Sequence, residues 1–290
     1  MSVQKVSKNV YAIKLNSSEF SNLPLINLYL VCDEKNMIID AGYDAINKDL
    51  LRILKELGIN IDYIAITHIH LDHASGAGLL LKSFPNAKVI VHERGVQHLL
   101  NPNKLWESAL LVLGEYAKGY SKPISIPIDN IIIGKDGVVF NLGNIEIKVL
   151  ETLGHASHHL CFFNGSHIFL GDTAGIYDNG IVIPNTPPPN FDYNENIKSI
   201  NRIISLNPKI LCYSHYDFSN NPQNLIIYKE RLKLWLKVIA NNLNDKELIN
   251  KILEVDKEVE LIVNKRRFEI NLSIQGILHY LERIGKKIEI

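Results

Sequence analysis

The stretch THIHLDH, residues 67–73, places three histidines and one aspartate within six consecutive positions. It follows the apolar run IDYIAI at 61–66, which predicts a buried strand leading directly into the motif. Side chains alternate between the two faces of an extended chain, so His68 and His70 are expected to project from the same face. Two imidazole nitrogens would then converge on one point.

The second half of the motif lies where the strand is expected to turn into a helix. That turn would aim Asp72 and His73 at a position beside the first pair, and the small residues Ala74 and Gly76 leave room for close backbone approach. Neutral imidazole and carboxylate bind divalent metals, and burying either without a partner is costly. Four such side chains so close together are therefore poorly explained as residues of a hydrophobic core. The motif instead predicts a metal site.

Three more candidate ligands come later in the chain. His155 follows a predicted strand in TLGH, Asp172 ends the strand SHIFLGD, and His215 ends KILCYSH. A lone histidine at such a place is often an ordinary loop residue. All three, however, lie at the carboxyl end of a strand, which is where α/β folds collect their ligands.

Strand and helix patterns account for most of the chain. Residues 3–15 alternate as one strand, and 27–42 predict two strands joined by a turn at Asp33 to Asn36. Residues 44–58 carry apolar side chains at helical spacing and end at Gly58, a favourable helix C-cap. Further strands are predicted in 87–93, 136–155, 159–165, 166–172 and 209–215, helices in 74–84 and 194–206, and an amphipathic stretch around 103–119. The pattern indicates an α/β sandwich.

The remainder of the chain predicts charged amphipathic helices. We expect a catalytic domain at 1–220 and a helical extension at 221–290, without a flexible linker. The proline-rich segment 184–193 is interpreted as an ordered loop, with a simple spacer as the alternative. The extension should bury an apolar stripe against the chain itself, a second copy in a homodimer, or the site as a lid; its members are Leu225, Ile226, Leu232, Leu236 and Ile239.

Composition narrows the class of protein. The 31 basic and 31 acidic residues cancel, so no field of one sign is available to attract nucleic acid or an anionic membrane. No apolar run approaches the ~18 residues that a membrane-spanning helix needs, and the N-terminus does not resemble a signal peptide. Cys32, Cys161 and Cys212 are expected to be reduced core residues. The prediction is a cytoplasmic protein that acts on a small molecule, without nucleic-acid or membrane partners.

The chain resembles the metallo-β-lactamase superfamily over roughly residues 3–218. The motifs of that superfamily are matched in the same order along the chain by THIHLDH, His155, Asp172 and His215. The resemblance implies an αββα sandwich of two mixed β-sheets flanked by helices. It also implies that His68, His70 and His155 hold one metal ion, that Asp72, His73 and His215 hold a second, and that Asp172 bridges them. The stretches GHASHHL, GDTAG and PPPNFDYNENIKSI further resemble a glyoxalase II-like branch.

This ligand set predicts hydrolysis. Two divalent ions can activate water for attack on a carbonyl carbon. Asp72 and Asp172 would orient this water and relay its proton, with Asp72 as the predicted catalytic residue. The bond would be an ester, thioester or lactone. Nitrogen and oxygen ligands without thiolate favour zinc, with iron or manganese as alternatives.

Glutathione is less well supported as part of the substrate. Glyoxalase II-like enzymes have a basic side chain soon after the bridging aspartate, whereas Asp172 is followed by TAGIYDNGIVIP. A basic clamp from Lys265, Arg266 and Arg267 is an alternative to a solvated charge run.

Two other classes remain open. A mononuclear iron persulfide dioxygenase would use two histidines and one carboxylate. A non-catalytic metal-binding member of the fold would be expected to have lost ligands, whereas all seven are present.

Overall fold

A computed structural model describes residues 2–15 and 23–285 of the chain. The chain divides into two compact units, of which the first comprises Met1–Glu151, Leu160–Asn164 and Ser214–Tyr216 and the second comprises Thr152–His159, Gly165–Tyr213 and Asp217–Ile290. The predicted boundary between 220 and 221 remains a prediction. Of the predicted domains, residues 1, 16–22 and 286–290 lie outside the described part.

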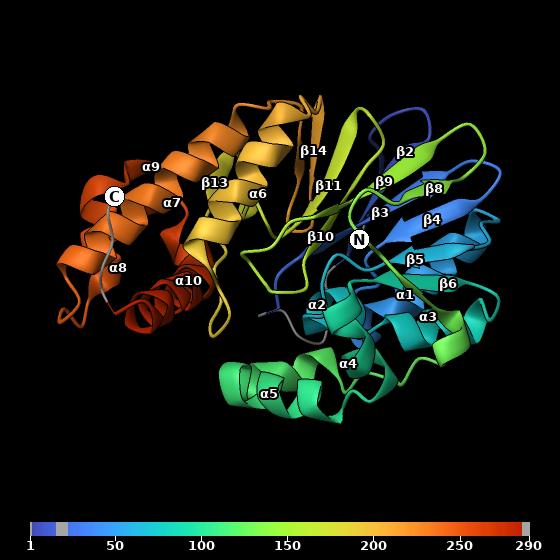
Figure 1. Cartoon of the computed structure of the whole chain (residues 1–290), viewed down its shortest axis with the longest axis horizontal. Coiled ribbons are helices and arrows are strands. Elements are labelled where there is room, and N and C mark those ends of the chain that lie inside the picture. Colours follow the sequence, from blue (N-terminus) through green and yellow to red (C-terminus); the bar gives the residue numbers. More distant parts are fainter. Residues whose placement is uncertain (1, 16–22, 286–290) are drawn as a thin grey trace. The chain divides into compact units, whose positions relative to one another are not determined.

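The first unit is built on a seven-stranded mixed sheet in the order β1-β2-β3-β4-β5-β6-β7 (Figure 1). Neighbours from β1 to β4 are antiparallel and those from β4 to β7 are parallel. Its strands are β1 Ser2–Lys5, β2 Val10–Leu15, β3 Ile26–Cys32, β4 Asn36–Ile39, β5 Tyr63–Ala65, β6 Lys88–Val91 and β7 Ile131–Ile133. An antiparallel group adds β8 Val139–Asn141, β9 Glu146–Glu151 and β10 Leu160–Phe163.

Helices in the first unit follow the parallel strands, as connections between parallel strands require. They are α1 Asp44–Glu56, α2 Leu71–Ala74, α3 Ala77–Ser83, α4 Val96–Leu100 and α5 Asn103–Leu113, with the 3-10 turns η1 Glu93–Gly95, η2 Gly114–Tyr120 and η3 Ile128–Asn130. Alternate residues of the strands, such as Leu28 and Leu30, form one hydrophobic core with Leu50 and Leu54 of α1 and Leu80 of α3. This core supports the strand ends that carry the THIHLDH motif.

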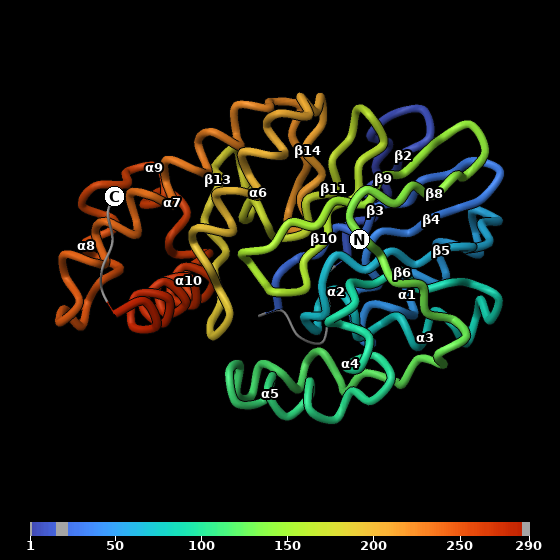
Figure 2. The backbone as a smooth tube through the Cα atoms, viewed as in Figure 1, coloured from blue at the N-terminus to red at the C-terminus, as the bar shows by residue number. Residues whose placement is uncertain are grey.

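The second unit combines strands with the C-terminal helices, whose course Figure 2 traces. Strand β11 His167–Gly171 runs parallel to β14 Ile210–Tyr213, which pairs with β15 Phe218–Ser219, while β12 Ile176–Asp178 and β13 Ile181–Ile183 form a hairpin. The helices are α6 Tyr193–Ser205, α7 Asn224–Asn241, α8 Leu248–Val255, α9 Lys257–Glu260 and α10 Val263–Arg283. No helix among the described residues is long and apolar enough to span a bilayer.

The predicted α/β class is confirmed, with two corrections to local details. Residues 3–15 form two strands instead of one, because the polar segment Ser7 to Asn9 makes a turn in which the amides of Val6 and Ser7 donate to the carbonyl of Val10. Ile226 of the predicted stripe is exposed, whereas Tyr228 and Trp235 are buried with the stripe's other members. That stripe packs within the second unit, against α6, β13, α8 and α10.

The cysteines agree with the expectation of reduced thiols. All three are free, Cys161 and Cys212 are buried, and Cys32 is half-buried. Burial raises the pKa of the Cys212 thiol well above its ordinary value, so this sulfur stays protonated at neutral pH.

Gly58 ends α1 as predicted. Its φ of +66° lies in the left-handed region, and no atom would contact an added Cβ. We therefore expect Gly58→Ala to lower the free energy of unfolding by about 1 kcal/mol through backbone strain alone, and Gly58→Asn to lower it less. Urea denaturation measures the difference; an alanine variant more stable than the wild type would contradict it.

Candidate metal centre

His68 and His70 lie on the extended segment that leaves β5, and their rings are close together. His68 is fully buried and His70 half-buried. The Nε2 atom of His68 lies 2.9 Å from Nδ1 of His70, and the ring centroids are 4.4 Å apart. Both imidazoles therefore face the same side of the chain, as the alternation predicts.

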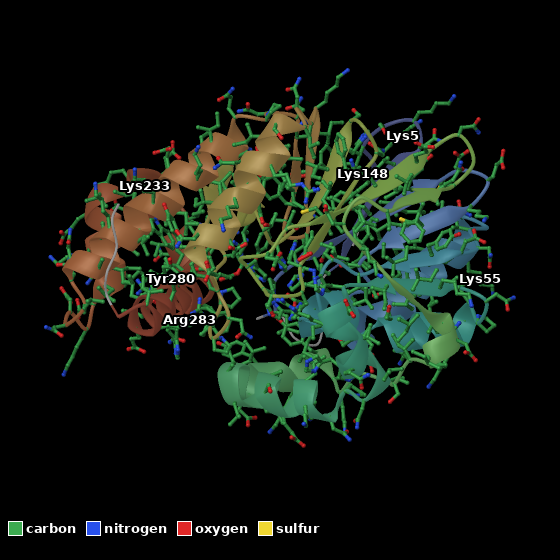
Figure 3. All side chains as sticks on the ribbon, in the orientation of Figure 1. Lys5, Lys55, Lys148, Lys233, Tyr280 and Arg283 are labelled. Atoms are coloured by element: carbon green, nitrogen blue, oxygen red, sulfur yellow. The ribbon has the colours of Figure 1, made fainter. Side chains whose placement is uncertain are left out.

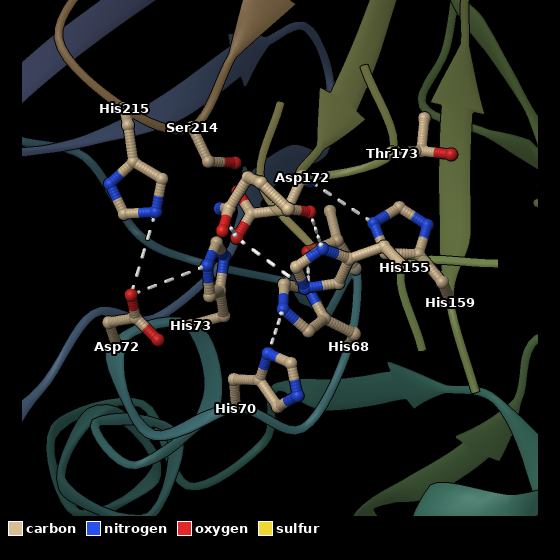
Figure 4. Close-up of polar contacts among 12 residues, drawn as sticks. His68, His70, Asp72, His73, His155, His159, Asp172, Thr173, Ser214 and His215 are labelled. Carbon is tan, nitrogen blue, oxygen red and sulfur yellow. Dashed lines mark hydrogen bonds and ion pairs between the residues drawn. The ribbon is translucent and has the colours of Figure 1, made fainter. Parts of the chain in front are cut away.

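Asp72 and His73 lie in the single turn of α2, and His215 approaches them from a different part of the chain. Oδ2 of Asp72 is 3.7 Å from Nε2 of His73 and 3.5 Å from Nε2 of His215 (Figure 4). The three residues offer ligand atoms that all lie within 4.8 Å of one another. Helix α2 thus presents a carboxylate and an imidazole toward the imidazole of His215.

The backbone of β3 holds His215 in this position. Residue 215 forms an antiparallel bridge with Ile26, and the amide of Asn27 donates to the carbonyl of Ser214 at 2.7 Å. Nδ1 of His215 lies 3.1 Å from the carbonyl oxygen of Leu25. Since a carbonyl oxygen can only accept, Nδ1 carries the proton of the neutral ring and Nε2 presents its lone pair to Asp72.

Asp40 is a buried residue that organises the same region, although it was not among the predicted site residues. Its carboxylate accepts hydrogen bonds from Thr67, through both the amide (2.8 Å) and the hydroxyl (2.9 Å), from Nδ1 of His73 (2.8 Å) and from Ser214 (3.2 Å). A signal was present in the sequence, because Asp40 comes directly after a buried strand, as Asp172 does.

These bonds decide which nitrogen of each ring is protonated. Nδ1 of His73 donates to Asp40, so Nε2 is its acceptor nitrogen. The hydroxyl of Thr67 donates to Asp40 and must accept from Nδ1 of His68, at 3.0 Å. His68, His73 and His215 therefore all carry the proton on Nδ1 and present Nε2 as a potential metal ligand.

His155 and Asp172, the two candidates in the second unit, also lie together. Both are buried, and Nε2 of His155 is 3.6 Å from Oδ2 of Asp172. Nδ1 of His155 donates to the carbonyl oxygen of Asn185 at 2.8 Å, and the amide nitrogen of the Asn185 side chain donates to Oδ2 of Asp172 at 2.8 Å. His155 thus has the same tautomer as the three histidines of the first unit.

His159 is a supporting residue. Its Nε2 accepts from the amide of Asp172 at 3.2 Å, and its Nδ1 lies 2.8 Å from the hydroxyl of Thr152. The His159 ring therefore links the side chain of Thr152 to the backbone of Asp172.

The donor set fits divalent metal ions. In each unit imidazole lone pairs face a carboxylate oxygen at 3.5–3.7 Å, so acceptors point at acceptors within a buried region. Such an arrangement is unfavourable until a cation occupies the space between them. The residues that could hold ions are His68, His70, Asp72, His73, His155, Asp172 and His215.

A family model described as the metallo-beta-lactamase superfamily matches residues 23–215, more than half of the 290-residue chain. The chain belongs to the metallo-beta-lactamase superfamily. Metallo-beta-lactamase fold-containing protein ST1585 of Sulfurisphaera tokodaii is 34% identical over 214 residues, which cover 72% of this chain and 78% of that protein. A hydroxyacylglutathione hydrolase of Prochlorococcus marinus is 28% identical over 234 residues, 79% of this chain and 74% of the relative.

Solved structures of the superfamily agree with the predicted fold. The crystal structure of ST1585 matches with a TM-score of 0.73 at 28% identity, covering 93% of this chain and 98% of that one. A metallo-beta-lactamase family protein of Thermus thermophilus, TTHA1429, matches with a TM-score of 0.71 at 20% identity, covering 97% and 95%, and supports the fold alone. The metallo-β-lactamase fold expected from the motifs is confirmed.

Within the basic run 265–267, Lys265 and Arg267 are exposed, as the solvated alternative predicts, whereas Arg266 differs from both alternatives. Arg266 donates to Asp178 at 2.8 Å and lies 3.6 Å from Glu269, with only 16% of its side chain exposed. It therefore ties α10 to the end of β12 and is neither a fully solvated charge nor a cation available to a substrate.

Proposed function

We propose that the chain is a metal-dependent hydrolase with a dinuclear centre, of the glyoxalase II-like branch. The observation that carries the proposal is that Nδ1 of His68, His73, His155 and His215 each lies within hydrogen-bond distance of an oxygen atom, which supports the same tautomer for all four and leaves each Nε2 as a potential metal ligand. The ligand assignment follows the family pattern. One ion would be held by His68, His70 and His155, the other by Asp72, His73 and His215, with Asp172 shared between them.

Bound divalent ions, for which zinc is the first candidate and iron or manganese the alternatives, would lower the pKa of water and polarise a carbonyl group. Asp72 is the protein group best suited to handle the proton of that water. Its side chain is 18% exposed, whereas those of His73 and His215 are 0% and 3% exposed. We assign Asp72 the task of accepting this proton and passing it toward the leaving group.

The proposed substrate is a small molecule with an ester, thioester or lactone bond. Relatives named hydroxyacylglutathione hydrolase support the thioester class. The segment after Asp172 lacks a lysine or arginine to bind glutathione, and Arg266 pairs with Asp178. We therefore propose an acyl group that is not carried by glutathione. Cytoplasmic location and homodimerisation remain predictions from the sequence.

A substrate panel tests this function. Metal-free protein is loaded with zinc, iron or manganese and assayed on matched ester, thioester, lactone and amide substrates. We expect turnover on at least one of the first three with two ions per chain, no turnover after chelation, and recovery when the metal is restored. If the protein binds one iron per chain and consumes oxygen with a persulfide substrate, its function is that of a dioxygenase and not a hydrolase. If it binds metal but turns over none of the substrates, it is a non-catalytic member of the fold.

A further inference from the structure

Asn185 touches both candidate ligands of the second unit, through different atoms. Its backbone carbonyl accepts from Nδ1 of His155, and its side-chain amide donates to Oδ2 of Asp172, each at 2.8 Å. The first bond fixes the tautomer and ring orientation of His155. The second bond holds Oδ2 of Asp172, so one residue sets the geometry of both groups.

The β12–β13 hairpin explains how a residue 13 positions after Asp172 returns to its side. Ile176 pairs with Ile183, and the hairpin turn contains Asn179 and Gly180, which both have positive φ. Asn-Gly between two apolar runs is a strong hairpin signal. The turn therefore sends the chain back alongside its own starting point and delivers Asn185 to Asp172.

Helix α10 holds the residues on either side of Asn185. The hydroxyl of Ser273 donates to the carbonyl of Pro184 at 2.8 Å and accepts from the amide of Thr186 at 3.2 Å, and the Thr186 hydroxyl donates to the carbonyl of Ser273 at 2.9 Å. A Cβ at Gly276 would overlap the carbonyl oxygen of Thr186. The helix surface thus matches the loop backbone closely.

The same helix secures the far end of the loop. The Arg283 guanidinium lies 5.6 Å from the ring centroid of Tyr280 and donates to the carbonyl of Phe191 (2.8 Å) and to Asp192 (3.0 Å). Figure 3 labels Tyr280 and Arg283 on this helix. Segment 184–192 is therefore held by α10 near both of its ends.

We propose that Asn185 is a positioning residue of the metal centre, and that α10, through Ser273, holds it in place. The inference rests on the proposed function, because it requires His155 and Asp172 to be ligands. It gives the C-terminal helices a specific task, which is to fix the loop that orients one part of the ligand set.

Metal affinity tests the proposal, measured by competition with a chromophoric chelator for Zn²⁺, together with the thermal midpoint of the metal-free protein. Asn185→Leu removes the side-chain donor at similar volume, and we expect zinc affinity to fall about 10- to 100-fold. Because Asn185 is only half-buried, the metal-free midpoint should stay close to that of the wild type. Asn190→Leu, at an exposed position of the same loop, is the matched control and should leave affinity unchanged.

Ser273→Ala probes the helix contact. It should reduce zinc affinity in the same direction as Asn185→Leu and also lower the metal-free midpoint, while Gln275→Ala at an exposed site on α10 should change neither. If Asn185→Leu does not fold, Asn185→Ala decides, because it removes the same donor without adding methyl groups. If the folded Asn185 variant binds zinc with an affinity within twofold of the wild type, the positioning role of Asn185 is overturned while the proposed function stands. A wild-type chain that binds no metal overturns the proposed function, and the positioning role falls with it.

Discussion

Replacing Asp172 with alanine should abolish turnover and metal binding at the shared position. Asp172 is 3% exposed, lies directly after β11, and accepts a hydrogen bond from Asn185 while its Oδ2 faces His155. If two ions share this carboxylate, as proposed, a methyl group cannot take its place. We expect the rate to fall by at least about a thousandfold, which corresponds to ~4 kcal/mol of transition-state stabilisation.

The measurements are metal content per chain and the rate on the best substrate of the panel. Asp172→Asn keeps the shape of the side chain but removes its charge, so it separates loss of the ligand from loss of packing. Asp129→Ala, at an exposed aspartate, is the control and should retain both metal and rate. Preserved turnover in Asp172→Ala would remove Asp172 from the ligand set.

Replacing Arg231 with methionine should cause the largest loss of stability among the substitutions considered. Arg231 is 8% exposed, and its guanidinium donates to Asp256 at 2.8 Å, to Glu258 at 2.6 Å and to the carbonyl of Val182 at 2.6 Å. Methionine would leave Asp256 as a buried carboxylate that keeps the hydrogen bond from the indole of Trp235 but loses its charged partner. Removing one partner of a buried ion pair costs about 3–5 kcal/mol.

Urea unfolding of the metal-free protein measures this loss. Arg52→Met is the matched control, because Arg52 also pairs with two carboxylates, at Asp49 and Glu56, but its side chain is 55% exposed. Surface pairs contribute about 0–1 kcal/mol, so this control should change little. The double variant Arg231→Met with Asp256→Asn should recover part of the loss. Equal losses at Arg231 and Arg52 would contradict the assignment of a buried ion pair.

Local patterns were sufficient for the features that depend on neighbouring residues. The spacing of apolar side chains predicted α1 and its end at Gly58, and alternation along an extended chain predicted that His68 and His70 face the same side. The placement of Asp172 and His215 after strands was likewise visible, because a strand's end is a local property. Each of these features is visible within a few residues, either as a regular spacing of side chains or as a residue that ends a helix or strand.

Residues that support the ligands from far away in the chain were not predicted. Asp40 bonds to His73, 33 positions later, and to Ser214, 174 positions later. Neither separation leaves a periodic signal. Asn185 was not predicted either. The hairpin turn at Asn179 and Gly180 is recognisable from the sequence, but the contacts of Asn185 with His155 and Asp172 form only in the folded chain.

By itself, the sequence determined the α/β class, the superfamily and the candidate ligands, because chemical identity and local spacing specify them. The tertiary structure alone decided the protonated nitrogen of His73, His155 and His215, because the oxygen that accepts from Nδ1 belongs to a residue far away in the chain. For His68 the acceptor is the neighbouring Thr67, but the hydroxyl of Thr67 is oriented by Asp40, 27 positions earlier. The tertiary structure also decided that α10 packs on the loop carrying Asn185, since the fit of Ser273 and Gly276 to that backbone exists only once both segments are folded.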